Sequence, residues 1–469
     1  MRKFLSLILS VIMVLSLLAC GSANADAPAA TEAPKEFMVG YSRENITPSN
    51  PTPLSGYGNT DERKHTEVLD YIYLTCVAMQ DTQGNIFLFY AADLCSNSDA
   101  SVGNIRSSVS GTTGVPAKNI TVNVSHTHSA PTGSDLGPAL QDAAVKTAKN
   151  AIEDLKPATM FAGIAETDRI NFVRHYYMND GSVVTDNHGN ATGKTYVGHT
   201  TEVDQEMRVI QFKREGGKDV ILVNWQSHPH ITGGSTKTSL SADIIGMFRM
   251  YLEQDVDCLF AYYQGGGGNI NPTSRIKEEN ANPEKNYKVH GQMLAGTCQE
   301  ALKNMTELQT GEIKHIQEIY SCATNKEDME LAAAAASVKA YYKEGHTIGE
   351  TKTFAESLGL ESLYHANSIS GRGSLGDTFE IEIDAYVIGD FGWIMAPCEM
   401  FDSTAKFIRE NSPTAFTFSC GYSNGAGGYF PTLECWEYGA YEVDTTRVAR
   451  GTAEKLADRF VEMLDELKG

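Results

Sequence analysis

The spacing of apolar and polar positions along the chain predicts a series of buried strands. Apolar runs rich in Ile, Phe and Tyr at residues 71–80 and 86–94 flank the turn sequence DTQGN, which indicates a hairpin. Comparable runs predict strands at residues 119–126, 206–215, 219–228 and 258–265, and one or two more within residues 378–397.

Between these runs the apolar positions recur at helical spacing. Helices are predicted at residues 100–114, 138–156, 243–254, 327–345 and 446–468. Strands and helices alternate from residue 37 to residue 469 without a repeat or a second linker. The pattern therefore predicts a mixed α/β (α+β) fold, in one large domain with central β-sheets flanked by helices.

The N-terminal region has a different pattern. MRK followed by FLSLILSVIMVLSLLAC is typical of a signal peptide over residues 1–20, and LLAC resembles a bacterial lipobox that places a lipid on Cys20. Residues 21–36 are rich in Ala, Pro and small polar residues, which indicates a flexible tether. We therefore expect an exported lipoprotein anchored to a bacterial membrane through Cys20. Plain secretion with cleavage near SANA is the alternative.

Charge and cysteine content narrow the range of partners. The formal net charge is −21, and such an acidic chain repels phosphate backbones, so we expect no nucleic-acid partner. The nine cysteines form no CxxC pair, which argues against a cysteine zinc site. Several of them lie in apolar runs and are expected to be buried.

Two His-x-His pairs stand out in a chain with 12 histidines. His126 and His128 follow one predicted strand, and His228 and His230 follow another. Residues two apart in an extended segment face the same side, so each pair can serve one pocket. Alone, either pair fits two metal ligands, one ligand with one acid/base group, or polar loop residues. Two such pairs at strand ends leave room for a carboxylate and a water, as in catalytic zinc sites.

Three other segments are candidates for the same site. Glu399 in WIMAPCEMFDS follows an apolar strand where a helix is expected to begin. It is either a metal ligand or an ordinary acid at a helix N-terminus. The glycine run in YYQGGGGNINPTS is either a flexible loop or an anion cradle, and it lacks the lysine of a nucleotide P-loop. The aromatic and glycine residues of CGYSNGAGGYFPTLECWEYGAYE fit either a ligand pocket or core packing.

In order, these motifs resemble those of the neutral/alkaline, non-lysosomal ceramidase family. HTHSAPTG is similar to the family's HTHSGPGG, APCEMFDSTA to PGEFTT, and NGAGGYFPTLECWEYGAYE to N…YxTTxEEYxxxxYE. VGYSRENITPSNPTPLSGYG and NWQSHP resemble two further family segments. The resemblance implies a ceramidase-like catalytic domain over residues 37–469, without the C-terminal immunoglobulin-like domain of the larger members.

The resemblance also implies roles for individual residues. It makes His126, His228, Glu399 and Tyr429 the ligands of Zn²⁺, places His128 beside the substrate amide, and matches Arg174 to an arginine in the substrate cleft. The implied reaction is hydrolysis of an amide, most readily of a ceramide-like N-acyl sphingolipid or related N-acyl lipid, by water that the zinc activates. His128 is then the acid/base group or a donor to the transition state.

The sequence departs from the family in the segment GNINPT, where ceramidases carry GDVSPN. Asn271 stands at the position of the family's serine, and Asn269 at that of its aspartate. Asn271 has no hydroxyl, although its amide can donate to an oxyanion. Two alternatives therefore stay open: a zinc hydrolase of the same scaffold acting on another amide or an ester, and a lipoprotein that binds a lipid or glycan without turnover.

Overall fold

The structure is a computed structural model that describes residues 35–58, 62–186 and 188–469. The predicted signal peptide, Cys20 and residues 21–34 of the predicted tether lie outside the described residues. Residues 35–469 form a single compact unit.

A nine-stranded sheet forms the first half of this unit, with strand order β14-β12-β11-β6-β1-β3-β4-β5 and β16 paired to β6. Its strands are β1 (Met38–Asn45), β3 (Tyr73–Gln80), β4 (Ile86–Ala92), β5 (Ile120–Val124), β6 (Lys156–Glu166), β11 (Glu206–Arg214), β12 (Asp219–Trp225), β14 (Cys258–Gln264) and β16 (Thr306–Leu308). The predicted hairpin is β3 and β4, which pair antiparallel. β4 pairs parallel with β5, and β12 pairs parallel with β14.

A second, four-stranded sheet packs against the first. It has the order β17-β18-β19-β21, formed by β17 (Ile313–Ala323), β18 (Thr378–Ile388), β19 (Phe391–Met395) and β21 (Phe416–Cys420). The rings of Phe89 in β4 and Trp393 in β19 stack with their centroids 4.6 Å apart. Alternate residues of β4 face opposite sides, so Phe89 joins this inter-sheet core while Leu88 and Tyr90 join the core beneath the helices. Burial on both faces explains why these strands appear as unbroken apolar runs.

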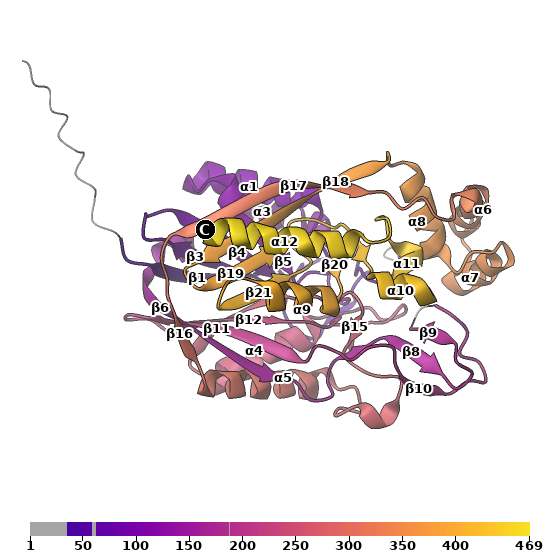
Figure 1. Cartoon of the computed structure of the whole chain (residues 1–469), viewed down its shortest axis with the longest axis horizontal. Helices are drawn as coiled ribbons and strands as arrows, with labels where there is room; N and C mark the ends of the chain where they lie inside the picture. Colours follow the sequence, from indigo (N-terminus) through magenta and orange to yellow (C-terminus); the bar gives the residue numbers. More distant parts are fainter. Residues whose placement is uncertain (1–34, 59–61, 187) are drawn as a thin grey trace, which may run out of the picture. The chain divides into compact units, whose positions relative to one another are not determined.

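Helices cover the outer faces of both sheets (Figure 1). α1 (Asp99–Thr113) and α3 (Pro138–Glu153) pack on β3 and β4, and α4 (Asp243–Asp255) and α5 (Tyr287–Lys303) pack on β11, β12 and β14. α9 (Asp402–Asn411) and α12 (Thr452–Lys468) cover the second sheet. The result is a helix–sheet–sheet–helix arrangement, which confirms the predicted fold class.

Two smaller units were not predicted from the sequence in full. α6 (Ala332–Lys343), α7 (Ile348–Ser357) and α8 (Leu363–Gly373) share a core of their own, and β10 (Tyr196–His199), β8 (His175–Met178) and β9 (Val183–Thr185) form a separate sheet. The predicted helix over residues 327–345 is shorter, because a 3₁₀ turn at Met329–Leu331 precedes α6. The predicted helix over residues 446–468 begins only at Thr452, because Gly451 adopts a left-handed φ of 79°.

Short elements complete the unit: β2 (Glu67–Val68), β7 (Phe172–Val173), β13 (Ser239–Leu240), β15 (Ile270–Asn271), β20 (Glu399–Met400), β22 (Tyr429–Phe430), α2 (Gly133–Leu136), α10 (Leu433–Tyr438) and α11 (Tyr441–Thr445). Across the described ranges, no helix has both the length and the apolar character that a membrane span requires. The eight cysteines in these ranges are all free and buried, as the apolar runs around several of them predicted.

Candidate metal centre

The ends of three strands converge at the candidate site. His126 follows β5, His228 follows β12, and Glu399 begins β20 after the turn at Pro397. The side chain of Asn123 in β5 holds two neighbouring strands close to the site, because it accepts from the backbone N–H of Gln264 at 2.8 Å and donates to the carbonyl of Gly421 at 2.8 Å. This buried amide links the ends of β5, β14 and β21.

His126, His228 and Glu399 form a compact group. Nε2 of His126 and Nε2 of His228 each lie 3.4 Å from Oε2 of Glu399. His228 is fully buried and His126 nearly so. The three atoms are spaced as ligands around one small cation are spaced.

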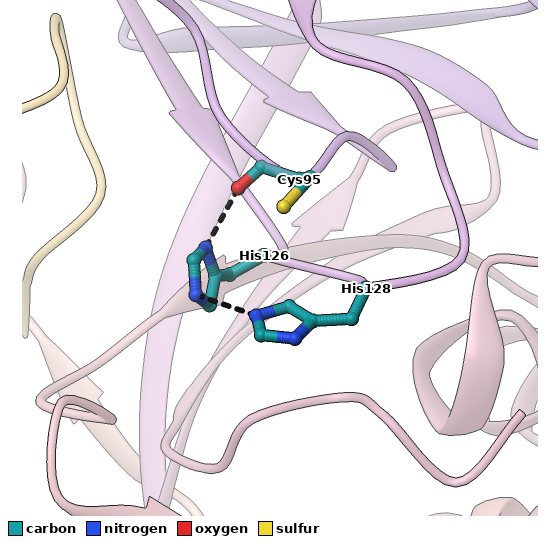
Figure 2. A group of neighbouring side chains, drawn as sticks. All are labelled: Cys95, His126 and His128. Carbon is teal, nitrogen blue, oxygen red and sulfur yellow. Dashed lines mark hydrogen bonds between the residues drawn. The ribbon is translucent and has the colours of Figure 1, made fainter. Parts of the chain in front are cut away.

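Hydrogen bonds fix which ring nitrogens carry a proton. Nδ1 of His126 lies 2.7 Å from the carbonyl oxygen of Cys95, and Nδ1 of His228 lies 3.0 Å from that of Ile270. A carbonyl only accepts, so both Nδ1 atoms donate, and in the neutral rings both Nε2 atoms carry lone pairs. Figure 2 shows the His126 ring held in this way against Cys95.

These lone pairs need a positively charged partner. Burial lowers the pKa of His228 to about 3, so its ring is neutral, and its Nε2 is buried without a hydrogen-bond partner. Two ring lone pairs and a carboxylate pointing at one another repel unless a cation lies between them. The residues therefore fit a metal ion.

The backbone at His126 is in an uncommon conformation. Its φ is 65°, in the left-handed region that non-glycine residues rarely adopt. Hydrogen bonds from Ser125 N–H to Ala92 and from His126 N–H to Leu94, both 2.9 Å, hold this turn against the end of β4. Such strain is typical of functional sites, where the surrounding structure imposes it.

His128 lies directly beside this group. Its Nε2 is 3.0 Å from Nε2 of His126, so the His128 ring reaches the edge of the proposed ligand group (Figure 2). Burial, together with the neighbouring histidines, lowers the pKa of His128 well below its usual value. A Cβ at Gly56 would lie 2.4 Å from the His128 ring, so only glycine at that position allows the ring its place.

Tyr429 and Arg174 lie on one side of the group. Tyr429 in β22 pairs in register with Glu399 in β20, and it lines the same cavity as His126. The Arg174 guanidinium lies over the Tyr429 ring, 5.5 Å from its centroid, and its Nε donates to Glu442 at 2.6 Å. The structure thus brings all four predicted ligands and both predicted substrate-contacting side chains into one neighbourhood.

Asn271 lines a different cavity from the one that His126 and Glu399 line. Its Nδ2 donates to Asp186, and its Oδ1 accepts from Nε2 of His230 at 3.0 Å. It lines a second cavity together with Arg174 and His128. Its amide is therefore part of a hydrogen-bonded chain that joins His230 to Asp186.

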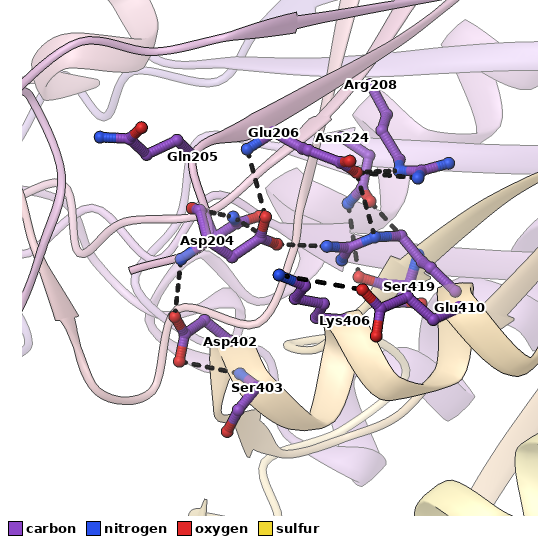
Figure 3. Close-up of polar contacts among 12 residues, drawn as sticks. Asp204, Gln205, Glu206, Arg208, Asn224, Asp402, Ser403, Lys406, Glu410 and Ser419 are labelled. Atoms are coloured by element: carbon purple, nitrogen blue, oxygen red, sulfur yellow. Dashed lines mark hydrogen bonds and ion pairs between the residues drawn. The ribbon is translucent and has the colours of Figure 1, made fainter. Parts of the chain in front are cut away.

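Asn269 has a structural role behind Glu399. Its Nδ2 donates to Asp402 Oδ1 at 2.8 Å, and its Oδ1 accepts from the Asp402 backbone N–H at 3.0 Å. An ionised aspartate only accepts, so the asparagine makes a contact to Asp402 Oδ1 that an aspartate could not make. Figure 3 shows that Asp402 also accepts from the backbone N–H groups of Asp204 and Ser403. Buried Arg409 pairs with Asp204. This network fixes the start of α9, immediately after Glu399.

Sequence reasoning missed three residues of the site. The Tyr422 hydroxyl lies 3.5 Å from Glu399 Oε2, and its ring packs 4.5 Å from that of His126. Tyr441 lines both cavities, and Glu442 pairs with Arg174 and His175. All three lie in the aromatic and glycine-rich segment that the sequence singled out, but nothing in the sequence showed which of its residues face the site.

The fold is that of the neutral ceramidases. The chain superposes on the crystal structure of a neutral ceramidase from Pseudomonas aeruginosa with a TM-score of 0.69 and 16% identity, over 92% of this chain and 75% of that one. A ceramidase complexed with C2 matches with a TM-score of 0.69 and 14% identity, over the same shares. No protein-family model matches the chain, and no curated protein sequence does. The family resemblance read from the sequence is thus confirmed for the fold.

Proposed function

We propose that the chain is a zinc-dependent hydrolase that cleaves the amide bond of an N-acyl substrate, as a ceramidase does. The observation that carries the proposal is the convergence of two ring lone pairs and one carboxylate oxygen, from His126, His228 and Glu399. Nitrogen and carboxylate donors in this number suit zinc with an open position, and Tyr429 supplies a further oxygen beside Glu399. Bound zinc would supply Lewis-acid chemistry to water and to the amide carbonyl.

Other residues of the chain then have separate roles in the proposed reaction. The His128 ring, whose Nε2 faces the proposed ligand group, is placed to donate to the amide as its carbonyl oxygen gains charge, or to the departing nitrogen. The Arg174 guanidinium, which is paired with Glu442, packs over the Tyr429 ring and holds that ring in place. Asn271, which replaces a serine, keeps open a second candidate: a hydrolase of the same scaffold acting on another amide or an ester.

Localisation is a further part of the proposal. The LLAC sequence supports export and attachment to a bacterial membrane through lipidated Cys20, with residues 21–36 as a tether. Such an anchor would place the site close to lipid amides. Mass spectrometry of Cys20 in the exported protein, with Cys20→Ala as the control, checks for the lipid.

Amide hydrolysis is tested with the full chain loaded with zinc. Short- and long-chain N-acyl amines are offered, and we expect release of free acid and amine. His128→Gln should keep full zinc content and lose about 10²–10⁴-fold in rate, the usual contribution of an acid/base group. His346→Gln, whose ring stacks on Tyr341 away from the cavity, is the matched control and should keep both. Absence of hydrolysis across the panel by zinc-loaded protein would refute the proposal.

A further inference from the structure

A second cavity, of 570 Å³, adjoins the metal cavity. The two cavities share wall residues: Gly56, His128, Tyr364, Tyr429 and Tyr441. A substrate whose reacting bond lies beside His128 therefore extends one part into each cavity. The chemistry of each wall indicates which part it accepts.

The metal cavity is the smaller of the two, and part of its wall outside the proposed ligands is apolar. Its volume is 320 Å³, and Val124, Pro397 and Cys398 line it together with residues 425–428. A Cβ at Gly427 would lie 2.4 Å from the carbonyl oxygen of Pro397, so the glycine loop is pressed closely against its neighbour. Ordinary ligand pockets begin at about 300 Å³. This side suits a short acyl group.

The second cavity has a polar wall. Its charged, amide and imidazole side chains come from Arg174, Asp186, His188, His230, Asn271, Arg275 and Lys352. Among the described residues of this wall, aliphatic side chains come from Ile348 and Leu363 alone. An alkyl chain placed here would desolvate polar groups without offering them hydrogen bonds, which is unfavourable. A hydroxylated occupant would satisfy more of these polar groups than an alkyl chain would.

Charged side chains in the wall of the second cavity are paired with side chains of opposite charge. Arg275 Nε donates to Asp186 at 2.7 Å, and Nδ1 of His188 lies 2.6 Å from Asp444. Arg174 is paired with Glu442 in the same way. A phosphate or carboxylate ligand requires cations that lack such partners. Alternating donors and acceptors instead suit hydroxyl groups, each of which both donates and accepts.

Aromatic rings complete the wall. Tyr57, Tyr364, Tyr429 and Tyr441 line the second cavity. Tyrosine offers an apolar ring face together with a hydroxyl that hydrogen-bonds. This combination complements a hydroxylated ring or chain, whose C–H groups pack on the ring faces while its hydroxyls reach the polar side chains.

We propose that the second cavity is a subsite for a polyhydroxylated amine, and that the substrate is a short-chain N-acyl amino sugar or amino polyol. The substrate class rests on the proposed amide hydrolysis. In that reaction water supplies the hydroxyl that forms the new C–O bond, the C–N bond breaks, and the amine leaves with the remaining proton of the water. The acyl group occupies the metal cavity, and the hydroxylated amine occupies the second cavity.

A matched pair of ligands tests the subsite by binding. N-acetylglucosamine, with N-acetylgalactosamine and N-acetylmannosamine beside it, is compared with N-cyclohexylacetamide, which has the same acyl group and ring size but no hydroxyls. Calorimetry on the zinc-loaded full chain should show at least one sugar binding about tenfold tighter or more, because several hydrogen bonds are gained. Equal or tighter binding of the cyclohexyl amide overturns the proposal.

Arg275→Gln tests the wall itself. This change leaves Asp186 without its cationic partner, so the binding of the preferred sugar should weaken about tenfold, while cyclohexyl binding and zinc content stay within about twofold. Arg169→Gln, at an exposed arginine beside Asp168, is the matched control. Unchanged sugar binding in Arg275→Gln contradicts the subsite.

Acetate release separates this inference from the proposed function. Sugar binding without release of acetate, or of acid from any other amide, refutes hydrolysis and leaves the subsite supported. Efficient hydrolysis of lipid amides together with preferred binding of the cyclohexyl amide supports hydrolysis and refutes the subsite.

Discussion

Replacing Glu399 by Gln is expected to abolish zinc binding and amide hydrolysis together. The amide of Gln keeps the size of the side chain but removes the negative charge that faces the two imidazoles. On the proposed function, loss of the charged ligand would remove the metal that supplies Lewis-acid chemistry to water, so activity should fall by at least about a thousandfold. Zinc content by atomic emission and release of free acid check both effects on the same sample.

The control for this prediction lies on the helix that follows Glu399. Glu410 near the end of α9 has an exposed side chain, paired with Lys406, and Glu410→Gln should keep zinc and activity. Circular dichroism should show both variants folded. Full zinc and full activity in Glu399→Gln would exclude Glu399 as a ligand.

The largest effect on stability is expected from Glu442→Gln. Glu442 is fully buried, and its carboxylate pairs with Arg174 at 2.6 Å and with His175 at 3.0 Å. Removing one partner of a buried ion pair leaves the other charge uncompensated, which costs about 3–5 kcal/mol. The free energy of unfolding from urea titration measures the loss. Glu300→Gln, in an exposed pair with Lys303, should cost at most about 1 kcal/mol.

The buried ion pair between Glu442 and Arg174 also makes the stability of the protein depend on pH. Burial opposes ionisation of Glu442, but Arg174 and His175 outweigh it and lower the pKa to about 2, from an ordinary value of 4.5. A lowered folded-state pKa stabilises the protein above the unfolded pKa, and this contribution is lost as pH falls from 4.5 toward 2. The wild type should therefore lose more stability than Glu442→Gln over that range. Parallel pH profiles would contradict this role of Glu442.

The main layers of the fold were predictable because their strands are buried on both faces. β4 and β12 appear in the sequence as apolar runs, which only the interior of two packed layers explains. α8 was missed because LYHANSISGRG contains glycine, serine and asparagine, which have weak helix propensity, so its helix depends on packing against α6 and α7. Such tertiary support leaves little local signal.

The candidate site was predictable only in part. The two His-x-His pairs mark strand ends, and the structure brings His126 and His228 together. The orientation of each ring depends on the carbonyls of Cys95 and Ile270, which lie 31 and 42 residues away from their partners in the chain. Sequence spacing carries no information on contacts of this kind. The same limit applies to Asp186, whose contact with Asn271 shows only in the folded chain.

The most direct test of the central claim is anomalous X-ray scattering at the zinc absorption edge from crystals of the active protein. The account predicts one peak per chain, about 2.0–2.2 Å from Nε2 of His126, Nε2 of His228 and a carboxylate oxygen of Glu399. A peak elsewhere, or none in crystals of protein that hydrolyses amides, would contradict the claim that these three residues hold the catalytic metal.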